Sequence, residues 1–249
     1  MKAMILAAGL GTRLRPLTND RPKALVEIAG HTLLEITLRR LAGFGIREVI
    51  VNVHHFADMV VDTLKTNNNF GMRVEISRED DLLLDTGGGL KKAAWFFQRS
   101  DRAQGPFLLH NVDVISTIDL ARMVQFHRDN RALATLAVQE RNTSRHLLFD
   151  EHGHLCGRQT GKDAAKIVRP SKPGTSLAFA GVHVISPEFL DMIAEHGVFS
   201  IITTYLRLAA EGQRILAFRA DEYYWRDLGK SENIAQLTDD IARGLLTPW

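Results

Sequence analysis

The chain has a single cysteine, Cys156, among its 249 residues. One cysteine cannot form an internal disulfide, a thiolate zinc cluster or a Cys-x-x-Cys redox pair, and this favours a reducing compartment. The sequence also has no apolar stretch long enough to span a membrane, and the apolar run after Lys2 is shorter than a signal-peptide core. We therefore expect a cytoplasmic protein with no membrane partner.

The chain also lacks a strong excess of either charge. It has 31 basic and 29 acidic residues, a formal net charge of +2, and no run of Lys and Arg with interleaved aromatic residues. Such a run is the usual mark of a nucleic-acid-binding surface, so we expect no nucleic-acid partner. No Ser-, Gly- or Pro-rich linker divides the sequence, and 45% hydrophobic residues suffice for a full core. These features predict one domain over residues 1–249, and the oligomeric state cannot be read from them.

Two common phosphate-binding motifs are missing as well. The dinucleotide fingerprint needs a third glycine where this chain has Leu14, which argues against a nicotinamide-dependent oxidoreductase, and the Gly-Lys-Ser/Thr of a Walker loop does not occur. What is present is an apolar run, Met4 to Ala8, followed by Gly9-Leu10-Gly11-Thr12-Arg13. The N–H groups of the glycines and the guanidinium of Arg13 suit the oxygens of a di- or triphosphate.

Apolar segments alternate with amphipathic ones along the chain. Strands are predicted at Met4–Ala8, Leu25–Ile28, Glu48–Val53, Met72–Ser77, Phe107–Asn111, Leu133–Gln139, Leu177–Ile185 and Arg214–Phe218. Helices are predicted at His31–Phe44, Phe56–Leu64, Leu90–Phe97, Asp119–Asp129, Pro187–Ala194, Ile201–Ala210 and Glu232–Arg243, with Thr32 and Ser231 as caps of the first and last. This order predicts an α/β fold with a doubly wound, mostly parallel central sheet. The polar stretch Arg141 to Pro173 predicts short antiparallel strands.

Two further segments are expected at the carboxyl edge of the sheet, where loops gather over one crevice. Asp85-Thr86-Gly87-Gly88-Gly89-Leu90 is expected to form a second glycine-rich turn that faces the same ligand as the first. Asp113 follows the strand Phe107–Asn111 directly. A carboxylate there suits a magnesium ion that bridges phosphates, while a helix cap or a turn is the alternative role.

Four separated segments together resemble the sugar-1-phosphate nucleotidylyltransferase family. They are Leu-Ala-Ala-Gly-x-Gly-Thr-Arg from Leu6 with Pro22-Lys23, the Thr-Gly-Gly-Gly from Thr86, Asp113, and Trp-Arg-Asp-Leu-Gly from Trp225. The resemblance implies the Rossmann-like nucleotidyltransferase fold, a nucleoside triphosphate and a sugar 1-phosphate as substrates, and Mg²⁺ as cofactor. The chain departs from the family at Val112, which is usually glycine, and in lacking Glu-Lys-Pro, whose lysine contacts the acceptor phosphate. Lys166, Arg169 and Lys172 are possible replacements for that lysine.

The resemblance also implies roles for individual residues. Arg13, Lys23 and Asp113 are expected to act in catalysis, and Asp113 and Asp227 to hold Mg²⁺. The nucleotide is expected to contact Leu6, Ala8, Gly9, Gly11, Thr12, Arg13, Thr86, Gly87 and Gly88. The sugar is expected to contact Asn111, Glu140, Ala180 and Gly181, within an acceptor side that covers roughly residues 140–230. Trp225 is expected to pack rather than to stack on the base.

Several functions stay open within this resemblance. The Leu-Asp-Thr-Gly-Gly-Gly and Ala-Phe-Ala-Gly segments, the missing Glu-Lys-Pro and the short C-terminus look most like the N-acetylmuramate-1-phosphate uridylyltransferases of cell-wall recycling. Mannose-1-phosphate and heptose-1-phosphate guanylyltransferases come next, followed by glucose-1-phosphate enzymes. A non-catalytic regulatory relative that binds a nucleotide sugar is the alternative class, although such relatives tend to lose the charged residues that this chain keeps. No general base is expected, since the attacking phosphate is already an anion.

Overall fold

The structure is a computed structural model that describes residues 1–98, 105–171 and 174–246. Its first half contains the parallel strands β1 (Lys2–Leu6), β4 (Glu48–Val53), β5 (Arg73–Arg78) and β6 (Phe107–Asn111). β1 lies between β4 and β6, and β5 pairs with β4. The middle of β1 is completely buried, as expected for a parallel strand that is covered on both faces. The predicted α/β fold with a mostly parallel central sheet is confirmed.

An antiparallel part continues the same sheet through β12 (Thr175–Ile185), which pairs with β6, β8 (Ala134–Gln139) and β9 (Arg145–Phe149). β9 is followed by β10 (Leu155–Thr160) and β11 (Lys166–Ile167), while β13 (Ile215–Arg219) runs parallel to β8. Within the described residues the sheet has ten strands, with β11-β10-β9-β12-β6-β1-β4-β5 as its main path. Short antiparallel strands were predicted for Arg141–Pro173, and β9 to β11 confirm them.

Two small ribbons lie beside the main sheet. β2 (Glu27–Ile28) pairs with β3 (His31–Thr32), and β7 (Val114–Ser116) pairs with β14 (Trp225–Asp227). Single 3-10 turns are η1 (Thr12–Leu14), η2 (Lys23–Leu25) and η3 (Asn68–Gly71). The strand predicted at Leu25–Ile28 is thus shorter than expected, because its first residue belongs to η2.

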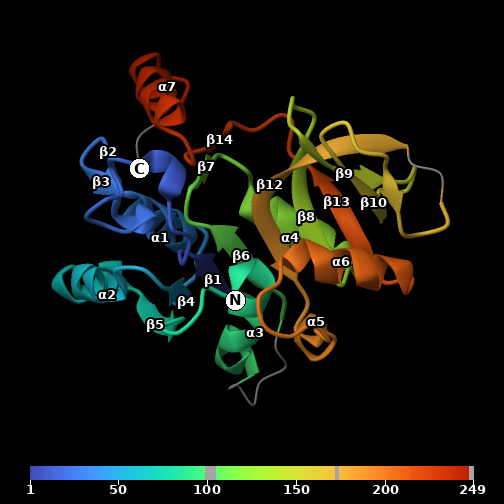
Figure 1. The fold of residues 1–249 in the computed structure, drawn as a ribbon, viewed down its shortest axis with the longest axis horizontal. Helices are drawn as coiled ribbons and strands as arrows, with labels where there is room; N and C mark the ends of the chain where they lie inside the picture. The colour runs from blue at the N-terminus through green and yellow to red at the C-terminus, as the bar shows by residue number, and fades with distance from the viewer. Residues whose placement is uncertain (99–104, 172–173, 247–249) are drawn as a thin grey trace.

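Helices cover both faces of the sheet (Figure 1). One face packs against α1 (Leu33–Gly43), α2 (Ala57–Thr66) and α4 (Leu120–Asp129), and the other against α3 (Asp85–Gln98), α5 (Glu188–Asp191) and α6 (Ile201–Ala210). The last helix, α7 (Ser231–Ala242), packs beside β14 at the edge of the molecule. Each face of the sheet has its own hydrophobic core, because successive side chains of a strand point to opposite faces. In β1, Ala3 and Ile5 pack into the core on the α1 side, and Met4 packs into the core on the α3 side. No helix among the described residues combines the length and apolar character needed to cross a bilayer.

Some helix boundaries differ from the sequence-based expectation. Thr32 caps α1 as predicted, and its hydroxyl accepts a hydrogen bond from the Glu35 N–H at 3.1 Å. Ser231 does not cap α7, because the helix already begins at this residue and Lys230 takes the capping position without a side-chain hydrogen bond. The helix expected over Pro187–Ala194 shrinks to α5, a single turn.

The largest difference concerns the three consecutive glycines. They were expected in a turn, but α3 begins at Asp85, so Gly87, Gly88 and Gly89 form its first turns. Close packing accounts for their helical conformation. A Cβ at Gly88 would lie 2.5 Å from the carbonyl oxygen of Gly197, and one at Gly89 would lie 2.8 Å from the Asn52 side chain. The glycines therefore serve close contact between α3 and its neighbours.

Candidate functional site

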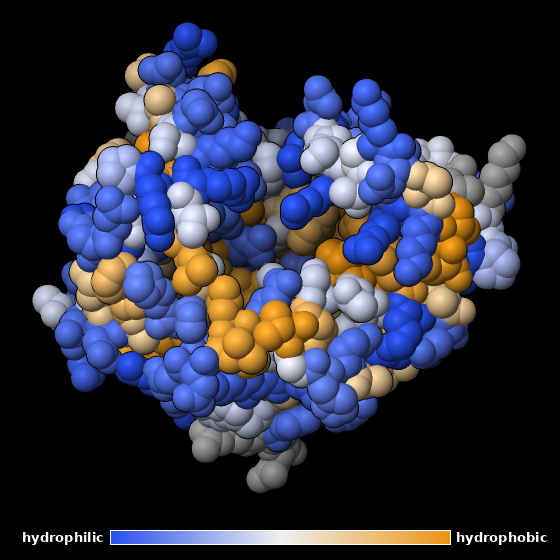
Figure 2. All heavy atoms as spheres, in the orientation of Figure 1, coloured by the Kyte–Doolittle hydropathy of each residue, from blue (hydrophilic) through white to orange (hydrophobic). Residues whose placement is uncertain are grey.

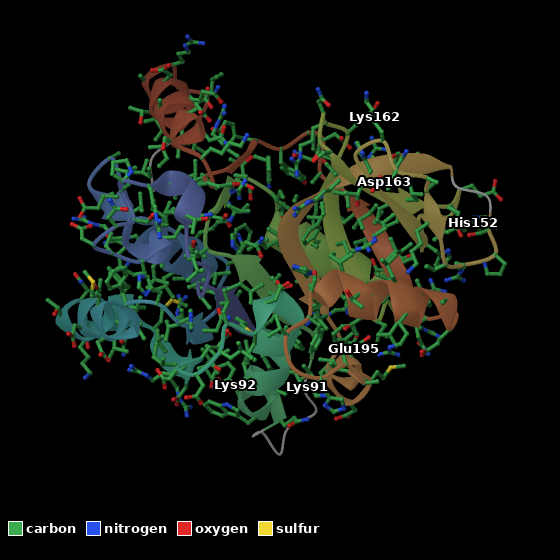
Figure 3. All side chains as sticks on the ribbon, viewed as in Figure 1. Lys91, Lys92, His152, Lys162, Asp163 and Glu195 are labelled. Atoms are coloured by element: carbon green, nitrogen blue, oxygen red, sulfur yellow. The ribbon has the colours of Figure 1, made fainter. Side chains whose placement is uncertain are left out.

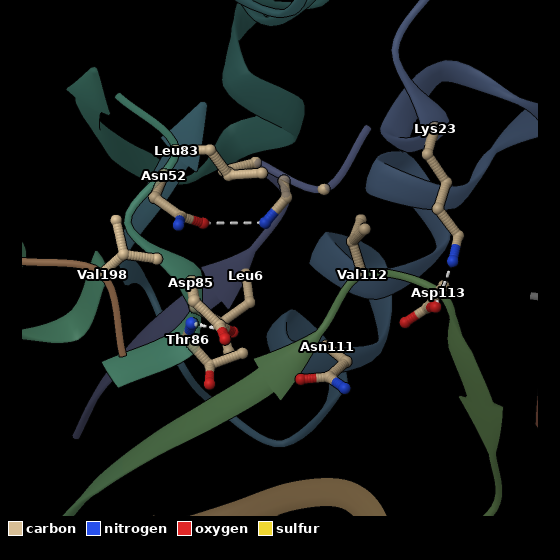
Figure 4. Close-up of a pocket in the computed structure, with 13 residues that line it drawn as sticks. Leu6, Lys23, Asn52, Leu83, Asp85, Thr86, Asn111, Val112, Asp113 and Val198 are labelled. Atoms are coloured by element: carbon tan, nitrogen blue, oxygen red, sulfur yellow. Dashed lines mark hydrogen bonds and ion pairs between the residues drawn. The ribbon is translucent and has the colours of Figure 1, made fainter. Parts of the chain in front are cut away.

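A cavity of about 370 Å³ lies at the carboxyl edge of the parallel strands (Figure 4). Its wall comes from the ends of β1, β4 and β6 and from the start of α3, the position where α/β sheets bind ligands. Leu83 and Val198 lie at one end and the charged pair Lys23 and Asp113 at the other. Residues that line it are Leu6, Ala7, Ala8, Gly9, Lys23, Asn52, Leu83, Asp85, Thr86, Asn111, Val112, Asp113 and Val198.

The loop after β1 folds over Lys23. Gly11 adopts a positive φ of 64°, and a Cβ there would lie 3.0 Å from the Thr18 methyl and 3.1 Å from the Lys23 Cβ. The Thr18 hydroxyl donates a hydrogen bond to the Gly11 carbonyl at 2.9 Å, and Leu14 is completely buried beneath the loop. Thr12 and Arg13 remain exposed. Within the described part of the chain, the Arg13 guanidinium has no hydrogen bond or ion pair, so it is free to bind an anion.

Lys23 and Asp113 form an ion pair at the charged end of the cavity (Figure 4). Their side chains are only 10% and 17% exposed, which limits screening by water. η2 carries Lys23, and Asp113 comes two residues after β6, so the pair joins segments that are 90 residues apart in the sequence.

Asp227 lies next to Asp113. It pairs with Val114 in the β14–β7 ribbon, and the N–H of Leu228 donates to the Asp113 carbonyl at 2.8 Å. A Cβ at Gly229 would lie 2.7 Å from both the Arg13 Nη2 and the Asp227 Oδ1, which shows how closely these two side chains approach. The structure therefore brings together Arg13, Lys23, Asp113 and Asp227, which sequence patterns had placed in three separate segments.

These residues fit a magnesium ion that is shared with phosphates. No group of three or more His, Cys, Asp and Glu side chains suited to a metal occurs in the described part of the chain. A preformed protein cage is thus missing there, but Mg²⁺ in phosphate-binding enzymes is usually held by one or two carboxylates together with substrate oxygens. Asp113 and Asp227 are two carboxylates whose backbones lie close together, which is the number of protein ligands that such a site uses.

A second, larger cavity of about 700 Å³ continues from the first, and the two share Asp85, Thr86 and Asn111. We call it the acceptor groove. Its wall consists of Asp85, Thr86, Asn111, Val114, Arg141, Thr143, Arg145, His146, Leu147, Arg158, Gln159, Thr160, Phe179, Gly181, His183, Ser200, Ile201, Ile202, Trp225 and Asp227. Figure 2 shows the hollow near the middle of this face of the molecule.

Close packing shapes the inner end of the acceptor groove. Gly181 has a positive φ of 75°, and a Cβ there would lie 2.8 Å from a Val114 methyl and 2.9 Å from the Asn111 amide nitrogen. The Trp225 indole N–H donates to the Ala180 carbonyl at 2.8 Å, and the Arg141 guanidinium lies 3.6 Å from the centre of the Trp225 ring. Trp225 therefore packs and supports Arg141. Burial lowers the pKa of Arg141, while the Asp227 carboxylate opposes this shift.

Some expected ligand contacts do not fit the geometry. The N–H groups of Gly87 and Gly88 both donate to the Phe199 carbonyl, at 2.9 and 3.3 Å, so they are not available to a nucleotide as expected. Glu140 lines neither cavity, and its carboxylate pairs with Arg219 at 3.4 Å. Ala180 is fully buried and does not line the groove, although Phe179 and Gly181 on either side of it do.

The basic residues of the acceptor groove also differ from those expected. Lys166 and Arg169 do not line it, and Arg169 instead donates to the Gln213 carbonyl at 3.3 Å. Lys172 lies outside the described residues. Arg141, Arg145 and Arg158 line the groove, and sequence reasoning missed them. Arg141 could have been found from the sequence, because it follows the end of a predicted strand. Arg145 and Arg158 could not, because their shared position depends on the pairing of β9 with β10.

Known proteins resemble this chain over most of its length. Residues 2–244 match the family model described as nucleotidyl transferase. The N-acetylmuramate alpha-1-phosphate uridylyltransferase of Caulobacter vibrioides is 36% identical over 239 residues, 91% of each chain. That of Neisseria meningitidis is 31% identical over 92% of this chain and 93% of the relative. The mannose-1-phosphate guanylyltransferase of Mycobacterium tuberculosis is 30% identical over 98% of this chain but 65% of the relative.

Solved structures share the fold. HddC from Yersinia pseudotuberculosis complexed with GMP-PN aligns with a TM-score of 0.74 and 22% identity over 96% of this chain and 99% of that one. The inositol-1-phosphate CTP transferase from T. maritima aligns with a TM-score of 0.76 and 15% identity over 98% and 96%. Identities this low support the fold alone, and the resemblance in the sequence motifs is confirmed by the family model and the closer relatives.

Proposed function

We propose a specific reaction for this chain from the premise that it belongs to the nucleotidyl transferase family. The chain is a sugar-1-phosphate nucleotidylyltransferase, since its relatives over nearly the whole length carry that activity in their names. The proposed substrates are UTP and N-acetylmuramate 1-phosphate. An oxygen of the acceptor phosphate attacks the α-phosphorus of UTP, the bond from this phosphorus to the β-phosphate oxygen breaks, and UDP-N-acetylmuramate and pyrophosphate are formed.

One observation carries the nucleotidyl-transfer chemistry. Lys23 and Asp113 pair in the wall of the first cavity, Asp227 lies in the wall of the acceptor groove, and Arg13 approaches Asp227 beside Gly229. Two polyanions must approach each other there, and fixed cations and oriented dipoles are the means by which proteins lower the cost of that approach. The choice of uridylyl transfer to N-acetylmuramate has separate support, because two relatives with this name match at 36% and 31% identity over at least 91% of their length.

Each charged residue has a proposed task in this reaction. Lys23 binds oxygens of the α-phosphate and of the acceptor phosphate, since it lines the charged end of the first cavity and pairs with Asp113, which precedes the ribbon that carries Asp227. Arg13, which is exposed and unpaired within the described residues, neutralises the departing pyrophosphate. Family members generally use a divalent metal, and we propose that Asp113 and Asp227 hold Mg²⁺, which when bound adds positive charge at the phosphates. The acceptor phosphate is already ionised near neutral pH, so no side chain has to remove a proton.

The test is a pyrophosphate-release assay with UTP, dTTP, GTP and CTP against a panel of sugar 1-phosphates. We expect the highest kcat/KM with UTP and N-acetylmuramate 1-phosphate. Release only with GTP and mannose 1-phosphate or heptose 1-phosphate would refute the proposed substrates and favour a guanylyltransferase. Tight nucleotide binding without release of pyrophosphate from any pair would favour a regulatory, non-catalytic protein.

We further propose that residues 1–249 act as one domain, that the protein works in the cytoplasm, and that it supplies nucleotide sugars for the cell wall.

A further inference from the structure

Two arginines stand side by side on the β9–β10 hairpin. In its register Arg145 pairs with Thr160 and Leu147 pairs with Arg158. Arg145 and Leu147 are two residues apart, so all four side chains point to the same face of the hairpin. Arg145 and Arg158 are therefore diagonal neighbours, a separation of roughly 7–8 Å that long side chains bridge easily. All four residues belong to the wall of the acceptor groove, as do His146 and Gln159 on the other face, so this end of the hairpin borders the groove.

Neither arginine has an acidic partner. Among the residues that the structure describes, no hydrogen bond or ion pair involves the guanidinium of Arg145 or Arg158. Figure 3 shows Lys162 and Asp163 at the end of the hairpin where β10 finishes, with His152 at the other end. The backbone carbonyl of Asp163 accepts from Gln159 at 3.3 Å, but its carboxylate pairs with neither arginine. Two like charges on neighbouring positions of a sheet repel each other, and a bound anion would remove that repulsion.

Arg141 is a separate cationic point at the inner end of the groove. Its guanidinium stacks on Trp225 and donates to the Phe179 carbonyl, and its Nε is buried without a hydrogen-bond partner. Asp227, the proposed metal carboxylate, also lines this inner end. Arg141 therefore lies on the phosphate side of the acceptor groove, whereas Arg145 and Arg158 belong to the hairpin that forms its outer wall.

We infer that Arg145 and Arg158 bind a second anionic group of the acceptor sugar, a carboxylate that is distinct from the 1-phosphate. The inference rests on the proposed function. N-Acetylmuramate carries such a carboxylate on its lactyl ether, whereas mannose and glucose 1-phosphates carry none. Guanidinium groups bind carboxylates through two parallel hydrogen bonds, so a pair of arginines selects for this group. Arg145 and Arg158 thus decide which sugars are accepted and take no part in the phosphate chemistry.

The test compares two acceptors that differ only by the lactyl group, N-acetylmuramate 1-phosphate and N-acetylglucosamine 1-phosphate, with UTP as the donor. The variants are Arg145→Gln, Arg158→Gln and the double variant. Lys166→Gln is the matched control, since it removes a positive charge from the adjacent strand β11 outside the groove. Charge-assisted hydrogen bonds of this kind are worth a factor of roughly 10 to 100. We expect each single variant to lose about tenfold or more in kcat/KM with the muramate, mainly through KM, and less than about twofold with the glucosamine.

The outcomes separate this inference from the proposed function. Equal losses with both acceptors, or no loss with either, would overturn the role of the arginines while the uridylyltransferase activity stands. Glucuronate 1-phosphate and glucose 1-phosphate form a second pair for the wild-type enzyme. Preference for the glucuronate without use of the muramate would refute the proposed sugar and support the carboxylate site. Use of neutral sugars alone would refute both. If no acceptor reacts, calorimetric binding of the muramate to the wild type and to the double variant decides the inference directly.

Discussion

Replacing Gly88 with alanine sets a helix preference against a steric conflict. Gly88 lies in the first turns of α3, where its Cβ would come 2.5 Å from the Gly197 carbonyl oxygen and 2.9 Å from the Leu84 Cβ. Neither atom is the end of a flexible side chain, so the backbone of residues 197–199 must move. That backbone is tied to α3, because the Phe199 carbonyl accepts from Gly87 and Gly88 and the Phe199 N–H donates to Leu84 at 3.2 Å.

The opposing contributions to stability have different sizes. Alanine in place of glycine favours a helix by about 1 kcal/mol. Overpacking costs about 1–3 kcal/mol, and each weakened backbone hydrogen bond to Phe199 costs about 1 kcal/mol more. The net result is a destabilisation of about 2 kcal/mol, which corresponds to a decrease of roughly 4–8 °C in Tm for a chain of this length. The steric conflict thus outweighs the helix preference.

Urea unfolding followed by circular dichroism measures this difference in the free energy of unfolding. Gly43→Ala is the control, because Gly43 ends α1, is exposed and leaves open space within 4 Å of the position that a Cβ would take. We expect that variant to be as stable as the wild type or more stable by up to about 1 kcal/mol. A Gly88→Ala protein that is as stable as the wild type would refute the steric explanation. Close packing would then not be the reason for glycine at this position of α3.

Three further predictions concern the site and the pH dependence. Asp113→Asn should keep Tm within a few degrees but lower kcat by about 100-fold or more, as measured by pyrophosphate release. The variant loses the charge that faces Lys23 and that is proposed to hold the metal. Near wild-type turnover would rule out the proposed metal role. Excess EDTA should abolish turnover and Mg²⁺ should restore it, and activity that persists in EDTA would contradict the need for a divalent ion. Burial lowers the pKa of His110 and His127 to about 4 and that of His183 to about 3. Below pH 6.5 the folded state therefore binds fewer protons than the unfolded chain, and the free energy of unfolding falls as the pH drops toward 4. Urea unfolding at pH 7.5 and 5.5 should show a loss of roughly 1 kcal/mol for each histidine, and His127→Gln should lose correspondingly less, whereas an equal loss would contradict the assignment.

Much of the fold follows from local patterns in the sequence. The apolar run of β4 is long and bounded by polar residues, and its predicted limits, Glu48 and Val53, agree with the structure. α6 also has its predicted limits, because Ser200 caps a strongly amphipathic segment. Asp113 was expected just after β6 and is found there. Where the pattern is periodic and the ends carry capping or polar residues, the sequence is sufficient.

Long-range packing decides the parts that the sequence did not predict. The glycines of α3 have poor helix preference, and only contacts with Asn52, Gly197 and Phe199, from distant segments, explain why they are helical. The register of two antiparallel strands likewise puts Arg145 and Arg158 on one face, whereas either residue alone reads as an ordinary surface charge. Such features depend on pairs of segments and therefore need the folded structure.

The strand β12 links the two cavities through the backbone. Its last residues pair with β6, which ends at Asn111, and its first residues pair with β9, which begins at Arg145. Between them the register shifts where Gly181 adopts its positive φ. The distance between Asn111 at the end of β6 and Arg145 at the start of β9 is therefore set by a single continuous strand, β12. If the proposed sites bind the acceptor, a sugar that is too short would reach only one of them, and the enzyme would select its acceptor by length as well as by charge.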